Sequence, residues 1–563
     1  MIKLGRLYFL QIVFIPFIDQ PFNYFGVLTY FTEGLVPSLS TEAHAKVQYC
    51  SMMTRQCSHL IENFVNEHFE GKKFSNCYEI YEKKRLGKGS YGTVYLCKHL
   101  RTGDQFACKV ISLNKINSHY LRKLHLEIAV MKEINHPQIV QLREVFFGSR
   151  TVYLVMELCQ GGEIHEIMSR YGRNGLPEEI VAKYLVDMLS ALKYLHSKGI
   201  MHRDLKLENF LLDQRIAENA SIKLVDFGLS KHFTEHEIVH QMVGSAYYTA
   251  PEVISGSYDQ RCDIWSLGVI AFIMLTGCPP FDGNSCNEIH KKIMYVDVDF
   301  NSKILNECSI DAKNFVKRLL TKSIDERISL EDALNHPFII NMKGKIDAAS
   351  KTMFHKSIRD ADNLNDLVDF MNCSRARQLM MKMIAFSLNP AQISQLGNEF
   401  HTLDVDKSGC ISIGALQRSL KLSLPTSVLR QHSEQIDNIS SNETLNYNEF
   451  VAAAMCKRIS IDEERLHVAF ESLDTQSTGH VSASSIRDIL GDDLSEDVMK
   501  EITIEVNCAH DGYIEWKEFL KYWRKIMIKN HVTPLQKLRG VVNKVVRSLR
   551  IMKALVKNKD SHV

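Results

Sequence analysis

The sequence predicts an α+β fold followed by an all-α region, and three observations support this. Alternating apolar and polar residues with glycine turns run from Tyr78 to Leu113 and indicate a small antiparallel sheet. From Glu178 onward, apolar residues recur at helical spacing. Four similar loops, 33 to 36 residues apart, then begin at Asp404, Asn438, Asp474 and Asn507. We therefore expect a bilobal α+β domain and, after it, an all-α domain of two lobes.

Length and composition place the chain among intracellular globular proteins. Its 563 residues suggest several domains, and 45% apolar residues with a net charge of +2 give no general attraction to nucleic acid. The 14 cysteines show no CxxC pairs, so neither a zinc site nor a disulfide framework is indicated. The predicted parts are an N-terminal extension (1–77), a bilobal domain (78–338), a connector (339–392), the four repeats (393–525) and a basic tail (526–563).

The N-terminal extension has two interpretations. Leu7 to Ile18 is apolar and follows Lys3 and Arg6, which resembles a signal or anchor segment. The run is shorter than the roughly 20 residues that span a membrane, and it contains Pro16. The alternative is a start that has been extended in error, with Met52 or Met53 as the true first residue. A cytoplasmic location is expected, with membrane association as the alternative.

A glycine-rich hairpin opens the bilobal domain. Gly87, Gly89 and Gly92 lie between two strands, where backbone N–H groups can approach phosphates. Lys109 follows on the next strand but one, and Glu127 lies on a helix that can hold its ammonium. Glycine-rich turns are common, so this hairpin becomes informative only through the residues that follow it.

Four further residues match the needs of phosphoryl transfer, which requires metal ions, their oxygen ligands and a base facing the acceptor hydroxyl. The stretch MHRDLKLENF supplies Asp204, Lys206 and Asn209, and LVDFG supplies Asp226. Together with Lys109 they provide a base, cations and metal ligands. The sequence therefore predicts a phosphotransferase site.

These motifs, in this order, resemble a eukaryotic protein kinase domain over residues 78–338. The resemblance implies ATP and Mg²⁺ as cofactors, with Lys109 on the phosphates, Glu127 as its partner and Asp204 as the catalytic base. It also implies that Asn209 and Asp226 are magnesium ligands and that Lys206 steadies the transferred phosphoryl group. Adenine is expected against residues that share an apolar surface or form the hinge: Leu86, Val94, Ala107, Met156, Glu157, Cys159 and Leu211. The alternative is a pseudokinase scaffold.

The same resemblance bears on anchoring, substrates and regulation. It implies that Glu252 pairs with Arg327 and that Asp263 anchors the catalytic loop. Lys206 and the serine at 245 favour protein serine and threonine substrates. Glu163 and Glu208 resemble residues that bind an arginine before the acceptor, although Glu163 has ATP ribose as an alternative ligand. Gln241 stands where a phosphorylated residue is usual, so control by loop phosphorylation is not expected.

The four repeated loops resemble EF-hand calcium loops with incomplete ligands. Such a loop needs oxygen ligands at positions 1, 3, 5, 7 and 9, glycine at 6 and glutamate at 12. The first loop ends in Ala415, and the fourth has Ala509 in place of the second ligand. Position 8, which joins paired loops, stays apolar in all four loops. Weak calcium binding is expected only at Asp404, Asp406, Ser408 and Cys410 and at Asn507, Asp511, Tyr513 and Glu518.

A kinase domain, a connector and four EF-hands in this order resemble the calcium-dependent protein kinases of plants and protists. In that family the connector is an autoinhibitory junction, and Asn363 to Leu388 has apolar residues at helical spacing and basic residues that suit the substrate groove. An amphipathic packing helix is the alternative. The incomplete loops resemble the related branch with degenerate EF-hands, which implies calcium-independent control by another partner.

The tail reads as a basic amphipathic helix. Between Leu538 and Val556 apolar residues fall on one face, and lysines and arginines flank it. This pattern is typical of segments that bind an anionic membrane surface or a calmodulin-like partner. Folding back onto the EF-hands or the substrate groove is the alternative.

Overall fold

The computed structural model describes residues 73–342 and 370–530 apart from internal gaps. The gaps are 90–91, 116–117, 172–174, 216–219, 235–236, 301–304, 306–307, 372, 389–392, 394–395, 398, 401–402, 405–406, 413–443, 459–462, 475–477, 483–485, 487–504 and 507–512. Several sequence predictions therefore lie outside the described residues: those on Asp406, Asn507 and Asp511, on 1–72, on most of the connector and on the tail.

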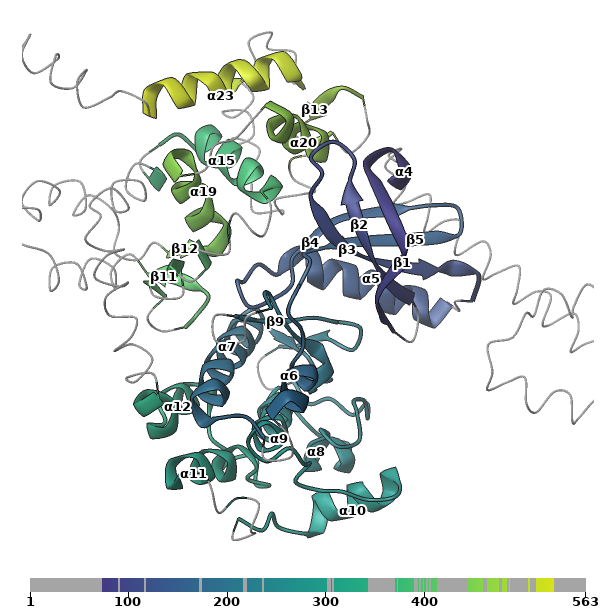
Figure 1. Cartoon of the computed structure of the whole chain (residues 1–563), viewed down its shortest axis with the longest axis vertical. Coiled ribbons are helices and arrows are strands. Elements are labelled where there is room, and N and C mark those ends of the chain that lie inside the picture. Colours follow the sequence, from purple (N-terminus) through teal and green to yellow (C-terminus); the bar gives the residue numbers. More distant parts are fainter. Residues whose placement is uncertain are drawn as a thin grey trace, which may run out of the picture.

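The first lobe is an antiparallel sheet with one helix against it (Figure 1). After the short helix α4 (Phe74–Cys77), the sheet has the order β1-β2-β3-β5-β4. Its strands are β1 (Tyr78–Lys88), β2 (Gly92–His99), β3 (Gln105–Ser112), β4 (Leu142–Phe147) and β5 (Thr151–Met156), with α5 (Ser118–Glu133) beside them. A Cβ at Gly92 would lie 2.6 Å from the Val110 carbonyl oxygen, so the close approach of β2 to β3 requires glycine there.

The second lobe is mostly helical, as the apolar spacing predicts. Its helices are α6 (Ile164–Tyr171), α7 (Glu178–Ser197), α8 (Pro251–Ser255), α9 (Cys262–Thr276), α10 (Cys286–Tyr295), α11 (Ile310–Leu319) and α12 (Leu330–Leu334). Helix α9 is apolar all round and almost wholly buried, so it forms the centre of the lobe. Short strands carry the loops between the lobes: β6 (Gly162–Glu163), β7 (Ile200–Met201), β8 (Phe210–Leu212), β9 (Ile222–Leu224) and β10 (Lys231–His232).

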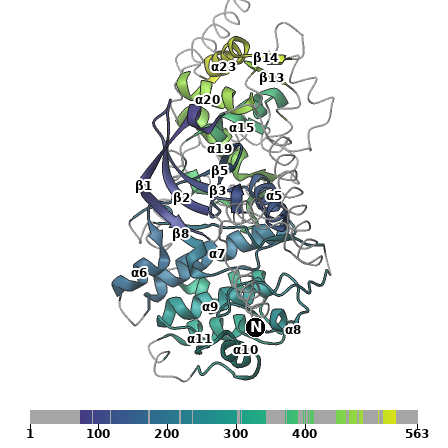
Figure 2. The same ribbon diagram turned by 90° about the vertical axis from the view of Figure 1, so that its right-hand side faces the viewer.

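The residues from 370 to 530 form what we call the C-terminal unit, which has an apolar core of its own. Its described elements are α15 (Arg375–Ser387), β11 (Cys410–Ser412), β12 (Thr444–Asn446), α19 (Tyr447–Arg458), α20 (Glu463–Leu473), β13 (His480–Ser482), β14 (Tyr513–Glu515) and α23 (Trp516–Asn530). Helix α15, which ends the segment expected to enter the substrate groove, packs against α19 and α20. Figures 1 and 2 both show α20 beside the strands of the first lobe.

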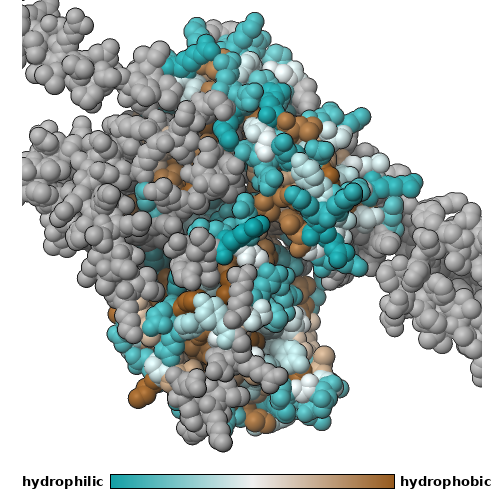
Figure 3. All heavy atoms as spheres, viewed as in Figure 1, coloured by the Kyte–Doolittle hydropathy of each residue, from teal (hydrophilic) through white to brown (hydrophobic). Residues whose placement is uncertain are grey.

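In Figure 3 hydrophilic residues cover most of the described surface on this face, and apolar residues occur between them in small groups. None of the helices in the described part has both the length and the apolar content needed to cross a bilayer.

Candidate active site

Lys109 lies in the interlobe site because strand alternation turns its side chain inward from β3. Its Nζ is 2.6 Å from Glu127 Oε1 on α5 and 3.7 Å from Asp226 Oδ1. Burial alone would lower the pKa of Lys109, but the two carboxylates outweigh it and raise the pKa above its ordinary value. The expected ion pair between Lys109 and Glu127 is therefore present, and Lys109 is a permanent cation.

The catalytic loop places Asp204, Lys206 and Asn209 together. Lys206 Nζ donates to Asp204 Oδ2 at 2.6 Å, and Ser245 Oγ donates to Asp204 Oδ1 at 2.9 Å. Asn209 Nδ2 donates to the backbone oxygen of Asp204 at 2.8 Å. The Asp204 carboxylate is thus held between a cation and a hydroxyl, in a fixed orientation.

Asp263, at the start of α9, anchors this loop as expected. Its fully buried carboxylate accepts the backbone N–H groups of His202 and Arg203 at 2.9 and 2.8 Å. Burial alone would raise the pKa of Asp263. The hydrogen bond to His196, the charges of His196 and His202 and the Arg203 amide outweigh it and hold the pKa below its ordinary value. The anchor is needed because Arg203 adopts a left-handed backbone conformation with φ of 68°, which is strained for a non-glycine residue.

Asp226 also has a left-handed backbone, with φ of 67°, and its side chain is 48% exposed. Burial of the carboxyl opposes ionisation, but the charge of Lys109, followed by that of His202, holds the pKa of Asp226 below its ordinary value. Asn209 belongs to the neighbouring chain segment, because its backbone oxygen accepts the Val225 N–H at 2.8 Å. An ionised carboxylate and an amide oxygen are the kind of hard ligands that Mg²⁺ prefers. The residues present therefore fit a magnesium ion.

The residues predicted to surround adenine come from both lobes. Ala107 on β3 lies opposite Met156 at the end of β5, and Val94 on β2 lies opposite Lys109. Leu86 on β1 is 49% exposed, as a residue at the mouth of a site would be. Leu211 on β8 pairs with Glu163 on β6 from the second lobe.

The carboxylate of Glu157, the first hinge residue, is directed away from this site. It forms a buried ion pair with Lys223 on β9, with Nζ and Oε1 2.7 Å apart. Only the backbone of Glu157 therefore remains for a ligand at this position. Burial raises the pKa of the Cys159 thiol above its ordinary value, which favours its protonated form.

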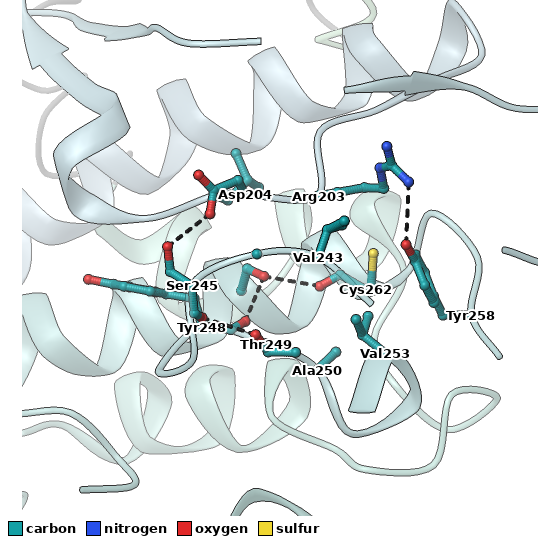
Figure 4. A pocket seen from close by; sticks show the side chains of 13 residues that line it. Arg203, Asp204, Val243, Ser245, Tyr248, Thr249, Ala250, Val253, Tyr258 and Cys262 are labelled. Atoms are coloured by element: carbon teal, nitrogen blue, oxygen red, sulfur yellow. Dashed lines mark hydrogen bonds between the residues drawn. The ribbon is translucent and has the colours of Figure 1, made fainter. Parts of the chain in front are cut away.

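A small pocket lies between the catalytic loop and the segment from Val243 to Val253 (Figure 4). Ser245 points across it to Asp204, and Arg203 reaches Tyr258 on its other side. Glu252, in the same segment, forms the expected ion pair with Arg327, whose two donor nitrogens lie 2.5 and 2.9 Å from the carboxylate oxygens. This pair fixes the segment to the helical lobe.

Sequence reasoning did not find Lys223 and Tyr258. Lys223 reads as one polar residue on a short strand, and Tyr258 lies in an ordinary loop before α9. Neither belongs to a motif with a chemical requirement. The only available signal was a charged residue inside an apolar strand, which calls for a buried partner.

Some of the predicted calcium ligands fall on described residues. Asp404 and Ser408 lie in one loop, where Asp404 Oδ1 accepts the Ser408 N–H at 3.1 Å and Ser408 Oγ donates to the Cys410 carbonyl at 3.1 Å. At the fourth loop Tyr513 is exposed, and Glu518 Oε2 accepts the Glu515 N–H at 3.1 Å. Within the described ranges no three His, Cys, Asp or Glu side chains gather as a metal site.

Comparisons with known proteins agree with this geometry. The family model described as "Protein kinase domain" matches residues 80–339. Calcium-dependent protein kinase 21 of Arabidopsis thaliana is 34% identical over 81% of this chain and 84% of its own length. Calcium-dependent protein kinase 5 of Plasmodium falciparum (isolate 3D7) is 33% identical over 80% and 78%, and calcium-dependent protein kinase 22 of Arabidopsis thaliana is 31% identical over 87% and 99%. The chain therefore belongs to the calcium-dependent protein kinase family, and it is a protein serine/threonine kinase.

Proposed function

We propose that this kinase transfers the γ-phosphoryl group of ATP to serine or threonine hydroxyls with Asp204 as the catalytic base. The observation that carries the proposal is the pair of contacts to the Asp204 carboxylate, from Lys206 at 2.6 Å and from the Ser245 hydroxyl at 2.9 Å. An oxygen that accepts one hydroxyl is suitably placed for another. Lys206 beside it is suited to the charge of the transferred group.

The residues around Asp204 take the ATP and Mg²⁺ that a protein kinase uses. In this assignment Lys109 binds the phosphates and Glu127 holds its ammonium, while Asn209 and Asp226 are the magnesium ligands. The ion, when bound, neutralises charge that develops on the phosphoryl oxygens. Gly87, Gly89 and Gly92 leave room for the phosphates, and the residues named for adenine line its two faces and the hinge.

Substrates with Arg or Lys three residues before the acceptor are the proposed preference. Glu163 and Glu208 support it, because both carboxylates are exposed near the catalytic loop and can pair with a cationic side chain. A peptide library should show the preference, and Glu208→Gln should weaken it without changing ATP binding. A library without a basic preference would contradict this specificity.

The C-terminal unit is proposed as a regulatory domain of EF-hand type with weak or partial calcium binding. In its two ribbons Ile411 pairs with Leu445 and Val481 pairs with Ile514, which are the position-8 residues of the four loops. Paired loops of this register are typical of EF-hand lobes, which supports the assignment. The fourth loop, which keeps Glu518, is the best candidate for the ion.

Calcium-independent control is the second candidate, and one contact favours it. Glu449 is the position-12 glutamate of the second loop, yet its Oε1 pairs with Lys382 Nζ of α15 at 2.5 Å. That glutamate therefore already has a cationic partner within the C-terminal unit. In this second candidate a membrane surface or a calmodulin-like protein controls the kinase through the basic tail. Truncation at Thr533 would then change both the binding of that partner and the kinase activity.

The test is phosphorylation of a basic serine peptide by the full chain with excess magnesium, in buffered calcium and in EGTA. Lys109→Met and Asp204→Asn serve as inactive controls. Strong stimulation by calcium supports the calcium-regulated form, and equal activity in both buffers supports the second candidate. Activity of either control variant at the wild-type rate would refute the catalytic assignment.

A further inference from the structure

The glycines at position 6 of the first and third loops of the C-terminal unit have the same backbone conformation but different surroundings. Gly409 and Gly479 hold position 6 of these loops, with φ of 81° and 80°. A Cβ at Gly409 would lie 2.4 Å from Tyr194 Cδ2 and 3.0 Å from His136 Cδ2, whereas a Cβ at Gly479 would meet nothing within 4 Å. The backbone of the first loop is therefore in direct contact with the kinase domain.

The surface that receives the loop is a fixed part of the kinase domain. The rings of His136 and Tyr194 stack with centroids 4.9 Å apart and an interplanar angle of 24°. Tyr194 Oη accepts the backbone N–H of Asn135 at 2.8 Å, and His136 Nε2 lies 3.3 Å from Ser190 Oγ. This pair of rings joins α7 to the segment between α5 and β4.

The loop holds its shape through its own hydrogen bonds. The Asp404 carboxylate, which is 1% exposed, accepts the backbone N–H groups of Ser408 and Gly409 at 3.1 and 3.0 Å. Asp474 does the same for Thr478 and Gly479 in the third loop. Because glycine at position 6 has no side chain, the backbone of the first loop packs directly against the two rings.

Two other residues add to the same contact. Lys407, at position 4 of the first loop, is only 8% exposed, although lysine is rarely buried. A Cβ at Gly397 would lie 3.4 Å from Tyr447 Oη and 3.7 Å from Pro137 Cβ, so the chain before the loop also lies against the segment that carries His136. The contact is thus broader than one glycine.

We propose that the first loop is a docking element that binds the His136–Tyr194 surface of the kinase domain, and that it is not a calcium site. Position 12, which should supply two oxygen ligands, is Ala415, so the loop lacks the ligand on which calcium affinity depends most. The docking rests on the proposed regulatory role of the C-terminal unit and assigns one of its four loops to holding the two parts together.

Hydrogen exchange of the full chain tests the docking, with Gly409→Ala and Gly479→Ala as matched variants. Both substitutions place alanine at the same positive φ, so both strain their loops alike. Only Gly409→Ala also drives a methyl group into Tyr194. We expect exchange in the peptide covering 134–140 to rise on the order of tenfold in Gly409→Ala, as for an overpacked contact, and to stay at the wild-type rate in Gly479→Ala.

A second variant guards against a loop that simply unfolds. Lys407 has φ of 54°, so Lys407→Gly relaxes the backbone while it removes the buried side chain. It should also raise exchange at 134–140. Calcium titration of Asp404→Asn should give the wild-type number of sites. Equal exchange at 134–140 in both glycine variants, or the loss of one calcium site in Asp404→Asn, would overturn the proposal. These readouts do not depend on whether calcium stimulates the kinase.

Discussion

Arg203, the residue before Asp204, reaches Tyr258, with Nη1 and Oη 3.5 Å apart (Figure 4). The Tyr258 hydroxyl in turn donates to the backbone oxygen of Gln241 at 2.6 Å, and Arg203 Nε donates to the Leu229 carbonyl at 2.8 Å. Backbone bonds between Val239 and Tyr258 hold the same segment. The Arg203 guanidinium therefore binds neutral oxygens, whereas in many kinases the arginine at this position binds a phosphate group on the neighbouring loop.

We predict that Tyr258→Phe lowers kcat/KM for a peptide about tenfold, because the Gln241 carbonyl loses its buried donor and Arg203 loses an acceptor. The KM for ATP should change little, since Tyr258 lies on the peptide side of the catalytic loop. Steady-state kinetics measure both values. Tyr295→Phe is the control, because Tyr295 is 80% exposed. Wild-type kinetics in Tyr258→Phe would show that the segment is held by its backbone alone.

The contacts among the residues proposed for catalysis were predictable where these residues stand at fixed positions within short motifs. The contacts of Lys109 and Asp204 follow from strand alternation and from a tight loop, which local sequence encodes. The contact between Asp263 and Arg203 was expected only from the family resemblance. The contact between Arg203 and Tyr258 joins residues 55 positions apart. Tyr258 lies in a loop that belongs to no motif, so this contact depends on how the helical lobe folds.

In the C-terminal unit, too, the sequence predicted contacts within the repeats but not the contacts with the kinase domain. The apolar residue at position 8 indicated that the loops join in pairs through short strands, and Ile411 and Leu445 do face each other. The contact between Gly409 and Tyr194 had no signal, because glycine at position 6 is explained by the loop turn alone. Contacts between two units depend on their surfaces as a whole, which periodicity does not describe.

Arg327→Met should lower the free energy of unfolding of the kinase domain by about 3 to 5 kcal/mol, because it leaves the buried Glu252 carboxylate without its cation. Arg261→Met is the matched control, since Arg261 pairs with Asp259 and its side chain is 37% exposed; its cost should be about 1 kcal/mol or less. Calorimetry measures the change, and the transition that an ATP analogue shifts identifies the kinase domain. Equal costs for the two variants would contradict the assignment of a buried ion pair.

Arg465 on α20 and Asp104 in the turn before β3 should couple the C-terminal unit to the first lobe. Their side chains are 15% and 11% exposed, and the two donor nitrogens lie 3.0 and 3.4 Å from the carboxylate oxygens. A double-mutant cycle with Arg465→Ala and Asp104→Ala should give a coupling energy of about 1 to 3 kcal/mol. Hydrogen exchange of the β2–β3 turn is the readout.

The matched control for this cycle is Arg524 with Glu463, a pair in the C-terminal unit whose side chains are 65% and 61% exposed. Its coupling energy should be about 0.5 kcal/mol or less because solvent screens it. The exchanged pair, Arg465→Asp with Asp104→Arg, should recover much of the protection of the turn. Additive single effects at Arg465 and Asp104 would mean that the two residues do not join the units.

His136 should make the stability of the kinase domain sensitive to acid. Burial, with the charges of Lys223 and Lys407, lowers the pKa of His136 from 6.5 to about 3, so the folded protein holds this ring neutral. A lowered pKa stabilises the fold above the ordinary value of 6.5, and this contribution is lost progressively as the pH falls toward 3. The groups that face the ring are Lys223, Lys407, Ser190 and Tyr194.

His136→Asn removes the titration and keeps an oxygen that can accept the Gln138 N–H, which His136 Nδ1 now accepts at 3.2 Å. Between about pH 6.5 and pH 5 the wild type should lose about 2 kcal/mol more stability than this variant. Burial raises the pKa of nearby Asp187 to about 6, which acts in the opposite direction, but Asp187 is present in both proteins and cancels in the comparison. Denaturant unfolding at the two pH values measures the difference, with the exposed His165→Asn as control. Parallel pH profiles for wild type and His136→Asn would mean that the ring takes up a proton in the fold, and the close packing of Gly409 and Lys407 over it would then have to open in acid.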